Sequence, residues 1–147
     1  MQKPKTKTQK GSKPRLPSLK KLKENLWQLC KQITRKRYVL PDGTWKCFSC
    51  GSIIDAPWKC HTGHCVPDQY GGLMLRYDLR NLRPQDYGCN INLGGNGAVY
   101  LMNLRKEIGD EEVDKMFELL SFKNKKFTVK EERAFLEGKI EEYKKLL

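Results

Sequence analysis

CFSCG, at residues 47–51, is the stretch that most strongly determines the predicted fold. Two cysteine thiolates separated by two residues can hold one Zn²⁺ from a tight turn, and the following glycine lets the backbone bend around the ion. A redox-active dithiol is the alternative, but it requires a strand–helix context that the flanking residues do not resemble. A tetrahedral zinc site needs two further ligands, and the candidates are Cys89, Cys60, Cys65, His61 and Asp86.

The residues around this cysteine pair predict short strands and loops. Residues 38–40 lead into the turn PDG at 41–43, and residues 45–48 return from it as a hairpin. Residues 52–88 continue as short strands and loops, among which LMLRY at 73–77 is the clearest strand. The cysteine pair is therefore expected at the end of a hairpin, in a small β-rich segment.

Both histidines of the chain lie in KCHTGHCVP at residues 59–67. One interpretation is structural, in which His61 and His64 bind zinc together with Cys60 and Cys65. The other is a catalytic site, because histidine exchanges a proton near neutral pH. The adjacent cysteines and the asparagine-rich segment that follows favour the catalytic interpretation.

That asparagine-rich segment is LRNLRPQDYGCNINLGGN, at residues 79–96. Asn81 can brace a loop through hydrogen bonds, and Asn90, Asn92 or Asn96 can offer a carbonyl oxygen to a hard cation. Asparagine is also a common turn residue, so most of these positions are expected to be ordinary turns.

Amphipathic helices are predicted on both sides of this region. The first extends from Ser18, its N-cap, to about Arg37, and Cys30 on its apolar side is expected to be a buried free thiol. Further helices are predicted at about 98–108, ending at a glycine, and at 110–120. Thr128 and Glu131 have capping-box spacing and open a last helix to residue 147. The expected fold class is α+β, a small β-rich metal core framed by helices.

Positive charge is concentrated at the N-terminal end. The formal net charge is +12 at pH 7, and residues 1–46 account for all of it. Residues 1–17 have few aliphatic side chains to offset chain entropy and are predicted to be disordered. A basic segment beside a neutral domain favours DNA as a partner, and a solubilising tail is the alternative. The side chains expected to contact nucleic acid are Lys20, Lys21, Arg35, Lys36, Arg37, Arg76, Arg80 and Arg83.

The sequence shows no feature of a membrane or secreted protein. No apolar run approaches the length of a membrane span, and no apolar stretch follows the basic N-terminus as it does in a secretory signal. We therefore expect a cytoplasmic protein with no membrane partner. For the six cysteines, that location favours metal binding over disulfides. The sequence leaves the oligomeric state open, with a dimer as one option.

Taken in order, CFSCG, HTGH, LRYDLRNL and the spacing C-N-x-x-x-x-G-N resemble the phage NinG (Rap) family of recombination nucleases, an HNH-like group. The resemblance covers about residues 45–120 and includes RKEIGDEEVD at 105–114. It implies a zinc-stapled ββα core with its following helices over residues 38–120. The basic helix at 18–37 would precede this core, and a C-terminal amphipathic helix at 121–147 would follow it.

The resemblance also implies roles for individual residues. HNH enzymes have a general-base histidine at the end of a first strand and a bracing asparagine on the return, which correspond to His64 and Asn81. Asn90 takes the position of a metal ligand at the start of a short helix. His61 lies where the family often has an aspartate, and it is the other candidate ligand for a catalytic Mg²⁺ or Mn²⁺.

A structural zinc is implied on three cysteines, Cys47, Cys50 and Cys89. The family usually has a second CxxC where this chain has Asp-Tyr-Gly-Cys at 86–89, so Asp86, Cys60 or Cys65 must complete the ligand set.

The function implied is that of a metal-dependent DNA endonuclease in phage recombination, acting in the host cytoplasm on branched or single-strand-containing DNA. The alternative is a non-catalytic, zinc-binding accessory protein that binds DNA. An RNA-binding zinc protein is a third hypothesis, but the sequence offers no aromatic pattern of the RNP type to support it.

Deletion of residues 1–17 tests the basic segment, because it removes Lys3, Lys5, Lys7, Lys10, Lys13 and Arg15. Affinity for DNA is expected to fall and its salt dependence to become shallower, since fewer phosphate counterions are released. Fluorescence anisotropy with labelled DNA at several salt concentrations measures both quantities. An unchanged affinity and salt slope would show that this segment serves only solubility.

Overall fold

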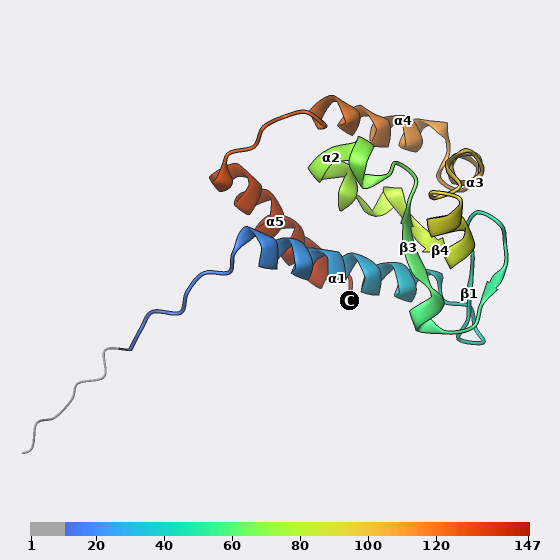
Figure 1. The fold of residues 1–147 in the computed structure, drawn as a ribbon, viewed down its shortest axis with the longest axis horizontal. Coiled ribbons are helices and arrows are strands. Elements are labelled where there is room, and N and C mark those ends of the chain that lie inside the picture. The colour runs from blue at the N-terminus through green and yellow to red at the C-terminus, as the bar shows by residue number, and fades with distance from the viewer. Residues whose placement is uncertain (1–10) are drawn as a thin grey trace, which may run out of the picture.

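The computed structural model describes residues 11–147 and shows helices around two small sheets (Figure 1), which confirms the α+β class. The helices are α1 (Leu19–Tyr38), α2 (Asp68–Arg76), α3 (Gly97–Ile108), α4 (Asp110–Glu118) and α5 (Val129–Lys144). The strands form two antiparallel pairs, β1 (Trp45–Lys46) with β2 (Ile53–Ile54), and β3 (His61–His64) with β4 (Leu82–Gln85).

The predicted disordered tail falls partly outside the described residues, which begin at residue 11. Residues 11–18 are in neither a helix nor a strand, and all of residues 11–18 are exposed. Within residues 11–147, none of the helices combines the length and the apolar character that a membrane crossing requires.

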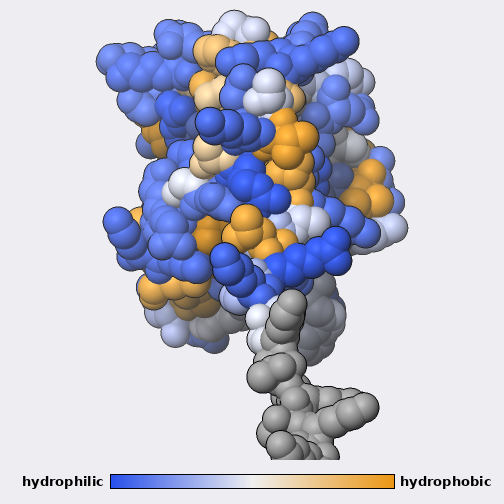
Figure 2. All heavy atoms as spheres, turned by 90° about the vertical axis from the view of Figure 1, so that its left-hand side faces the viewer, coloured by the Kyte–Doolittle hydropathy of each residue, from blue (hydrophilic) through white to orange (hydrophobic). Residues whose placement is uncertain are grey.

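Helices α1 and α5 pack against each other and form one apolar cluster (Figure 1). Each begins at a predicted cap: Ser18 Oγ accepts a hydrogen bond from the Lys21 amide, and Thr128 Oγ1 accepts one from the Glu131 amide, both at 3.1 Å. The face of the molecule at the start of these helices is mainly hydrophilic, with small apolar patches (Figure 2). The buried side chains of the two helices are Leu22, Leu26, Cys30, Ile33, Leu136, Ile140 and Tyr143.

The pair β3–β4 lies between α1 and α3. On one face of the pair, Leu82 packs into the α1–α5 cluster. On the other face, the buried Gln85 donates hydrogen bonds from Nε2 to Ser49 Oγ at 2.7 Å and to the Gly95 carbonyl at 2.8 Å. From α3, Tyr100 donates its hydroxyl to the carbonyl of Gly63 at 3.0 Å. A single π-helical turn, η3 (Gly88–Asn92), follows β4 directly.

The prediction of a hairpin over residues 38–48 is wrong in its pairing. Tyr38 is the last residue of α1, and β1 pairs with β2 in the register Trp45↔Ile54. The indole of Trp45 donates to the Arg35 carbonyl at 2.9 Å, so β1 is held against the end of α1. The turn itself forms, because the Leu40 amide donates to the Thr44 carbonyl at 2.7 Å.

The prediction of a strand at residues 73–77 is also wrong, because residues 73–76 are the second half of α2. A short apolar run fits a buried strand and a buried helix equally well, so its pattern alone does not separate them. Gly72, with a φ of +74°, kinks the helix, and Leu75 is then buried in a cluster with Tyr100 and Leu104. Packing against α3 therefore decides that residues 73–76 are helical.

The helices predicted after residue 97 agree more closely with the structure than the strands predicted before it. Helix α3 ends at Gly109, which has a positive φ of 87°, and α4 begins at Asp110. The C-terminal helix is shorter than the predicted 121–147, because a 3₁₀ segment and a loop precede its cap at Thr128.

Gly63→Ala is expected to lower the free energy of unfolding by about 2–3 kcal/mol. A β-carbon at this position would lie 1.8 Å from Gln85 Oε1, and the buried Gln85 is held by its own hydrogen bonds. Gly138→Ala is the control: Gly138 is exposed on α5, a β-carbon there meets no atom within 4 Å, and alanine is the better helix former. Chemical denaturation measures both variants, and equal stabilities would contradict the packing described for β3–β4.

Candidate metal centre

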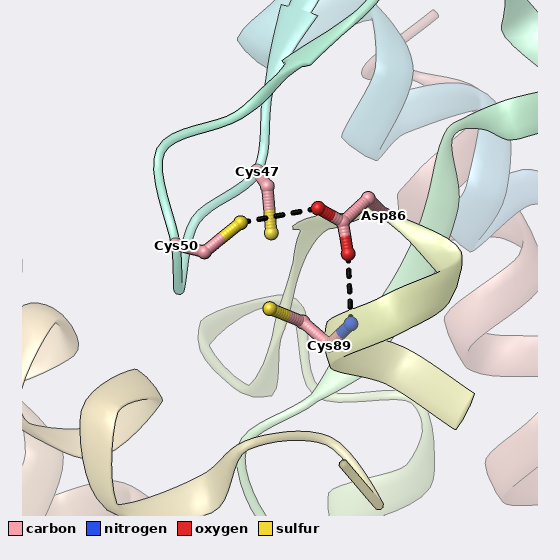
Figure 3. Close-up of side chains that lie close together, drawn as sticks. All are labelled: Cys47, Cys50, Asp86 and Cys89. Carbon is pink, nitrogen blue, oxygen red and sulfur yellow. Dashed lines mark hydrogen bonds between the residues drawn. The ribbon is translucent and has the colours of Figure 1, made fainter. Parts of the chain in front are cut away.

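Four side chains converge beside the end of β4, where Cys47, Cys50, Asp86 and Cys89 point toward one another (Figure 3). Each offers one ligand atom, and these four atoms all lie within 4.8 Å of one another. Two come from the loop after β1, one follows β4 directly, and one lies in η3. This set is named the metal centre below.

Backbone contacts hold the two halves of the metal centre in place. The Phe48 amide donates to the Pro84 carbonyl at 2.9 Å, which fixes the cysteine loop to β4. From α3, Asn103 Nδ2 donates to the Phe48 carbonyl at 2.8 Å. Gly51 has a φ of +78°, a conformation that glycine adopts without strain, and it closes the loop by donating to the Cys47 carbonyl at 2.9 Å.

Asp86 links the two halves through both carboxylate oxygens. Its Oδ1 accepts a hydrogen bond from the Cys89 amide at 2.7 Å, and its Oδ2 accepts one from the Cys50 thiol at 3.1 Å. The first of these bonds has the larger effect in holding the pKa of Asp86 below its usual value. A carboxylate that is ionised at neutral pH is therefore placed among three thiols.

The donor set fits Zn²⁺. Burial raises the pKa of the Cys89 thiol to about 12, so a thiolate there is unfavourable unless a cation lies against it. Three sulfur donors with one carboxylate oxygen match the ligands and coordination number of structural zinc. The ion would be held by Cys47, Cys50, Asp86 and Cys89. Its binding would contribute much of the free energy of folding in so small a core.

The metal centre excludes the other predicted fourth ligands. Cys60 is buried in the same apolar cluster as Cys47 and Cys89 but is not a member of the group, and Cys65 belongs to a different cluster. Neither His61 nor His64 is a member, so the alternative of a zinc knuckle built from both histidines is wrong for this structure. Cys30 is a buried free thiol, as predicted.

The structure brings His61 and Asn90 together. The amide nitrogen of Asn90 lies 3.0 Å from Nδ1 of His61, and the ring of Tyr87 lies edge-on to the His61 ring with centroids 5.8 Å apart. Asn90 follows Cys89 in η3, so the metal centre and this pair are positioned by the same turn. The cation site predicted on these two residues stays a prediction.

His64 lies at the other end of β3 in a different environment. Its ring stacks on Trp27 of α1 with centroids 5.2 Å apart, and Nε2 lies 3.0 Å from the Arg76 carbonyl and 3.3 Å from Asp68 Oδ1. Because a carbonyl only accepts, Nε2 carries the proton and Nδ1 keeps a lone pair. Burial lowers the pKa of His64, and the nearby Asp68 opposes this shift only in part.

Asn81 is fully buried and has the geometry of a brace. Its Nδ2 donates to the carbonyls of Val66 and Leu75 at 3.0 Å, and its Oδ1 accepts from the Val66 amide at 2.7 Å. These bonds join the segment after β3 to the end of α2, which holds the Arg76 carbonyl near His64. Asn81 therefore fixes the backbone segment that His64 contacts.

The structure does not join His64 to the His61–Asn90 pair. The two histidines are three residues apart on a strand, so their side chains emerge on opposite faces. Among the contacts of the described residues, the partners of His61 and those of His64 have no member in common.

The predicted arginines differ in exposure. Arg83 is buried, pairs with Glu107 at 3.2 Å and lies over the ring of Tyr38. The phosphate contact predicted for Arg83 is therefore wrong, because its side chain is part of the protein core. Arg80 pairs with Asp78 at 2.7 Å. Arg76 is more exposed and lies 3.5 Å from Asp68.

The basic residues predicted on α1 fall in two groups. Lys20, Lys21, Lys36 and Arg37 are all exposed, but the Lys36 ammonium bonds to the carbonyl of Leu147. Arg35 is half-buried and reaches the Cys60 carbonyl at 3.5 Å. The exposed members remain candidates for phosphate contact.

Sequence reasoning missed several residues at these sites, namely Trp27, Asp68, Gln85, Trp58 and Tyr87. Asp68 follows His64 by four residues across a helix start, a spacing that was available in the sequence. The stacking partner of His64 had no such signal, because it lies 37 residues away on α1.

The fold and the metal centre define a small α+β protein with a group of three cysteines and one aspartate that can hold a metal ion. The family model described as "Bacteriophage Lambda NinG protein" matches residues 1–146. The chain belongs to this family, which confirms the resemblance seen in its motifs.

Individual relatives agree with this assignment. Protein ninG of Escherichia phage 933W is 37% identical over 89 residues, which are 60% of this chain and 41% of that protein. Protein ninG of Escherichia phage lambda is 34% identical over 70 residues, 48% of this chain and 33% of that protein. The matched segment thus spans less than half the length of these relatives. No solved structure matches the chain.

Cys50→Ser is expected to lower zinc content from about one ion per chain and to lower the melting temperature, because serine is a poor zinc ligand. Cys50 is exposed, so loss of packing does not explain such a change. Metal analysis by mass spectrometry and thermal unfolding measure the two effects. Cys60→Ala, in the same apolar cluster but outside the metal centre, should keep its zinc; a zinc-free, well-folded wild type would overturn the assignment.

Proposed function

We propose that this protein is a metal-dependent DNA endonuclease of the HNH type that acts in phage recombination. The arrangement of β3, β4 and η3 carries the proposal: an antiparallel pair is followed at once by a short helical turn. His64 ends the first strand of this ββα unit, and Asn90 lies in the turn. Membership of the NinG family supports this assignment, and so does the exposed positive charge on α1.

The His61–Asn90 pair is the proposed ligand pair for the catalytic cation. Two atoms that occupy adjacent positions of an octahedral ion at about 2.1 Å lie about 3 Å apart, and the facing atoms of His61 and Asn90 are separated by 3.0 Å. Rotation of the Asn90 amide by half a turn brings its oxygen to this position. A divalent cation bound there would neutralise the scissile phosphate and the leaving oxygen, and the imidazole ligand favours Mn²⁺ over Mg²⁺.

His64 is the proposed general base. Its Nε2–H is held by the Arg76 carbonyl, so Nδ1 is the atom that takes a proton from the attacking water. The lowered pKa keeps the imidazole neutral near pH 7, as a base requires. Trp27 fixes the plane of the ring, and Asn81 is a positioning residue for the segment that contacts it.

The separation of His64 from the His61–Asn90 pair favours a second candidate function. A zinc-stabilised accessory protein that binds DNA needs no shared site between these residues, whereas hydrolysis needs the base and the cation at one phosphate. Cleavage assays on duplex, single-stranded and branched DNA with Mg²⁺ or Mn²⁺ separate the two candidates. Absence of cleavage by the wild type with every ion and substrate would favour the accessory protein.

His64→Ala is expected to reduce the cleavage rate by about 10²–10⁴-fold, through loss of proton transfer, while zinc content and DNA affinity persist. Because burial lowers the pKa of His64, the wild-type rate should begin to decline at a lower pH than an ordinary histidine base would give. This decline should be missing from the residual activity of the variant. Single-turnover kinetics across pH measures both effects, and full activity in His64→Ala would sink the assignment.

Asn90→Ala is the companion variant for that experiment. Because Asn90 is a proposed ligand of the catalytic cation, Asn90→Ala should raise the Mn²⁺ or Mg²⁺ concentration needed for half-maximal cleavage. The zinc content should not change. A loss of zinc in Asn90→Ala would instead mean that the turn η3 is disturbed, and the cation role would then be withdrawn.

A further inference from the structure

A pocket of about 420 Å³ lies beside His61, on the outer side of the metal centre. Its walls come from β2, from the 3₁₀ turn η1 (Pro57–Lys59) and from the junction of β4 with η3. The residues that line it include Ile53, Trp58, Lys59, His61 and Tyr87. It is named the Trp58 pocket below.

Three large apolar side chains of the Trp58 pocket face solvent. Trp58 is 79% exposed, Ile53 is 61% exposed and Tyr87 is 57% exposed. None of the three belongs to an apolar cluster of the described residues. An indole held in water loses the burial that usually stabilises it, and such a grouping marks a binding surface.

The backbone that carries these side chains is well ordered by hydrogen bonds. In η1, the Lys59 amide donates to the Ala56 carbonyl and the Cys60 amide donates to the Pro57 carbonyl, both at 3.1 Å. Ile53 is on β2, which pairs with β1, and Tyr87 lies between two members of the metal centre. The pocket is therefore presented by elements that the core already holds in place, so little ordering is needed on binding.

One basic side chain lines the Trp58 pocket, and a second contacts the backbone directly after η1. Lys59 follows Trp58 directly, and the Arg35 guanidinium reaches the carbonyl of Cys60, the next residue. The Lys59 ammonium pairs with Asp55 at 2.8 Å, but both side chains are more than half exposed, so exchange of Asp55 for a phosphate costs little. Aromatic faces beside cations are the combination that single-stranded nucleic acids bind.

We propose that the Trp58 pocket binds an unpaired nucleobase of single-stranded DNA by stacking on Trp58, and so places the strand next to the His61–Asn90 pair. The substrate class rests on the proposed nuclease function. Bases in an intact duplex already stack on each other and do not offer a free face, so the pocket selects unpaired segments. It is thereby a specificity determinant that directs the protein to branched or gapped DNA.

Intrinsic fluorescence tests this proposal in the full-length, zinc-loaded protein without added Mg²⁺ or Mn²⁺. Of the three tryptophans, Trp45 is buried and Trp27 is partly buried and stacked on His64, so Trp58 is the most exposed of them. A twelve-residue oligothymidylate should quench the emission and shift it, whereas a twelve-base-pair duplex should have a much smaller effect.

Matched variants complete the test. Because these variants lack the reporting indole, their binding is measured by the anisotropy of a labelled oligothymidylate. Trp58→Ala should weaken this binding by about tenfold, with Trp58→Phe in between, because stacking needs an aromatic face. Tyr70→Ala is the control: Tyr70 is 60% exposed on α2 and does not line the pocket, and this variant should bind as the wild type does.

The outcomes separate this proposal from the nuclease function. Equal binding of oligothymidylate by wild type and Trp58→Ala, or equal quenching by the duplex, overturns the pocket assignment even if the wild type cleaves DNA. Weaker oligothymidylate binding by Trp58→Ala, with binding by Tyr70→Ala unchanged, supports the pocket even if no divalent ion supports cleavage, in which case only the nuclease function fails.

Discussion

The approach of the cysteine loop to the turn after β4 is the constraint on which the rest of the structure depends. It brings Cys47 and Cys50 against Asp86 and Cys89, residues far apart in the chain, with four ligand atoms within 4.8 Å of one another. The apolar cluster around it is small, so packing alone stabilises this end weakly. A bound cation would provide the missing stabilisation, because it would favour the thiolate forms of the cysteines and hold them beside the carboxylate.

One short turn then serves several purposes at once. Within residues 86–90, Asp86 and Cys89 face the metal centre, Tyr87 faces the Trp58 pocket, and Asn90 faces His61. Successive residues of a helical turn point in different directions, so a single rigid segment can supply a structural ligand, a stacking surface and a candidate cation ligand. A metal ion bound at the metal centre would thus set the geometry of the proposed chemistry without contacting substrate.

Buried polar side chains hold the remaining strand pair in place. Asn81 satisfies three hydrogen bonds inside the protein, and Gln85 spans from the cysteine loop to the segment before α3. Loss of one partner would leave the other buried and unpaired, which costs about 1–3 kcal/mol per group. Asn81 also holds the end of α2, whose Arg76 carbonyl contacts His64.

The sequence by itself determined the features that depend on local chemistry. Ser18 and Thr128 mark helix starts because their hydroxyls cap amides three residues later, and the cysteine loop follows from the CxxC spacing and Gly51. The family was also evident, because an ordered series of motifs is seldom shared by chance. Tertiary structure decided what depends on distant partners: the pairing of β1 with β2, the helical state of residues 73–76, the placement of Asp86 beside the three cysteines, and the burial of Arg83. It also gave His64 its stacking partner, because Trp27 of α1 belongs to a segment that no local pattern links to His64.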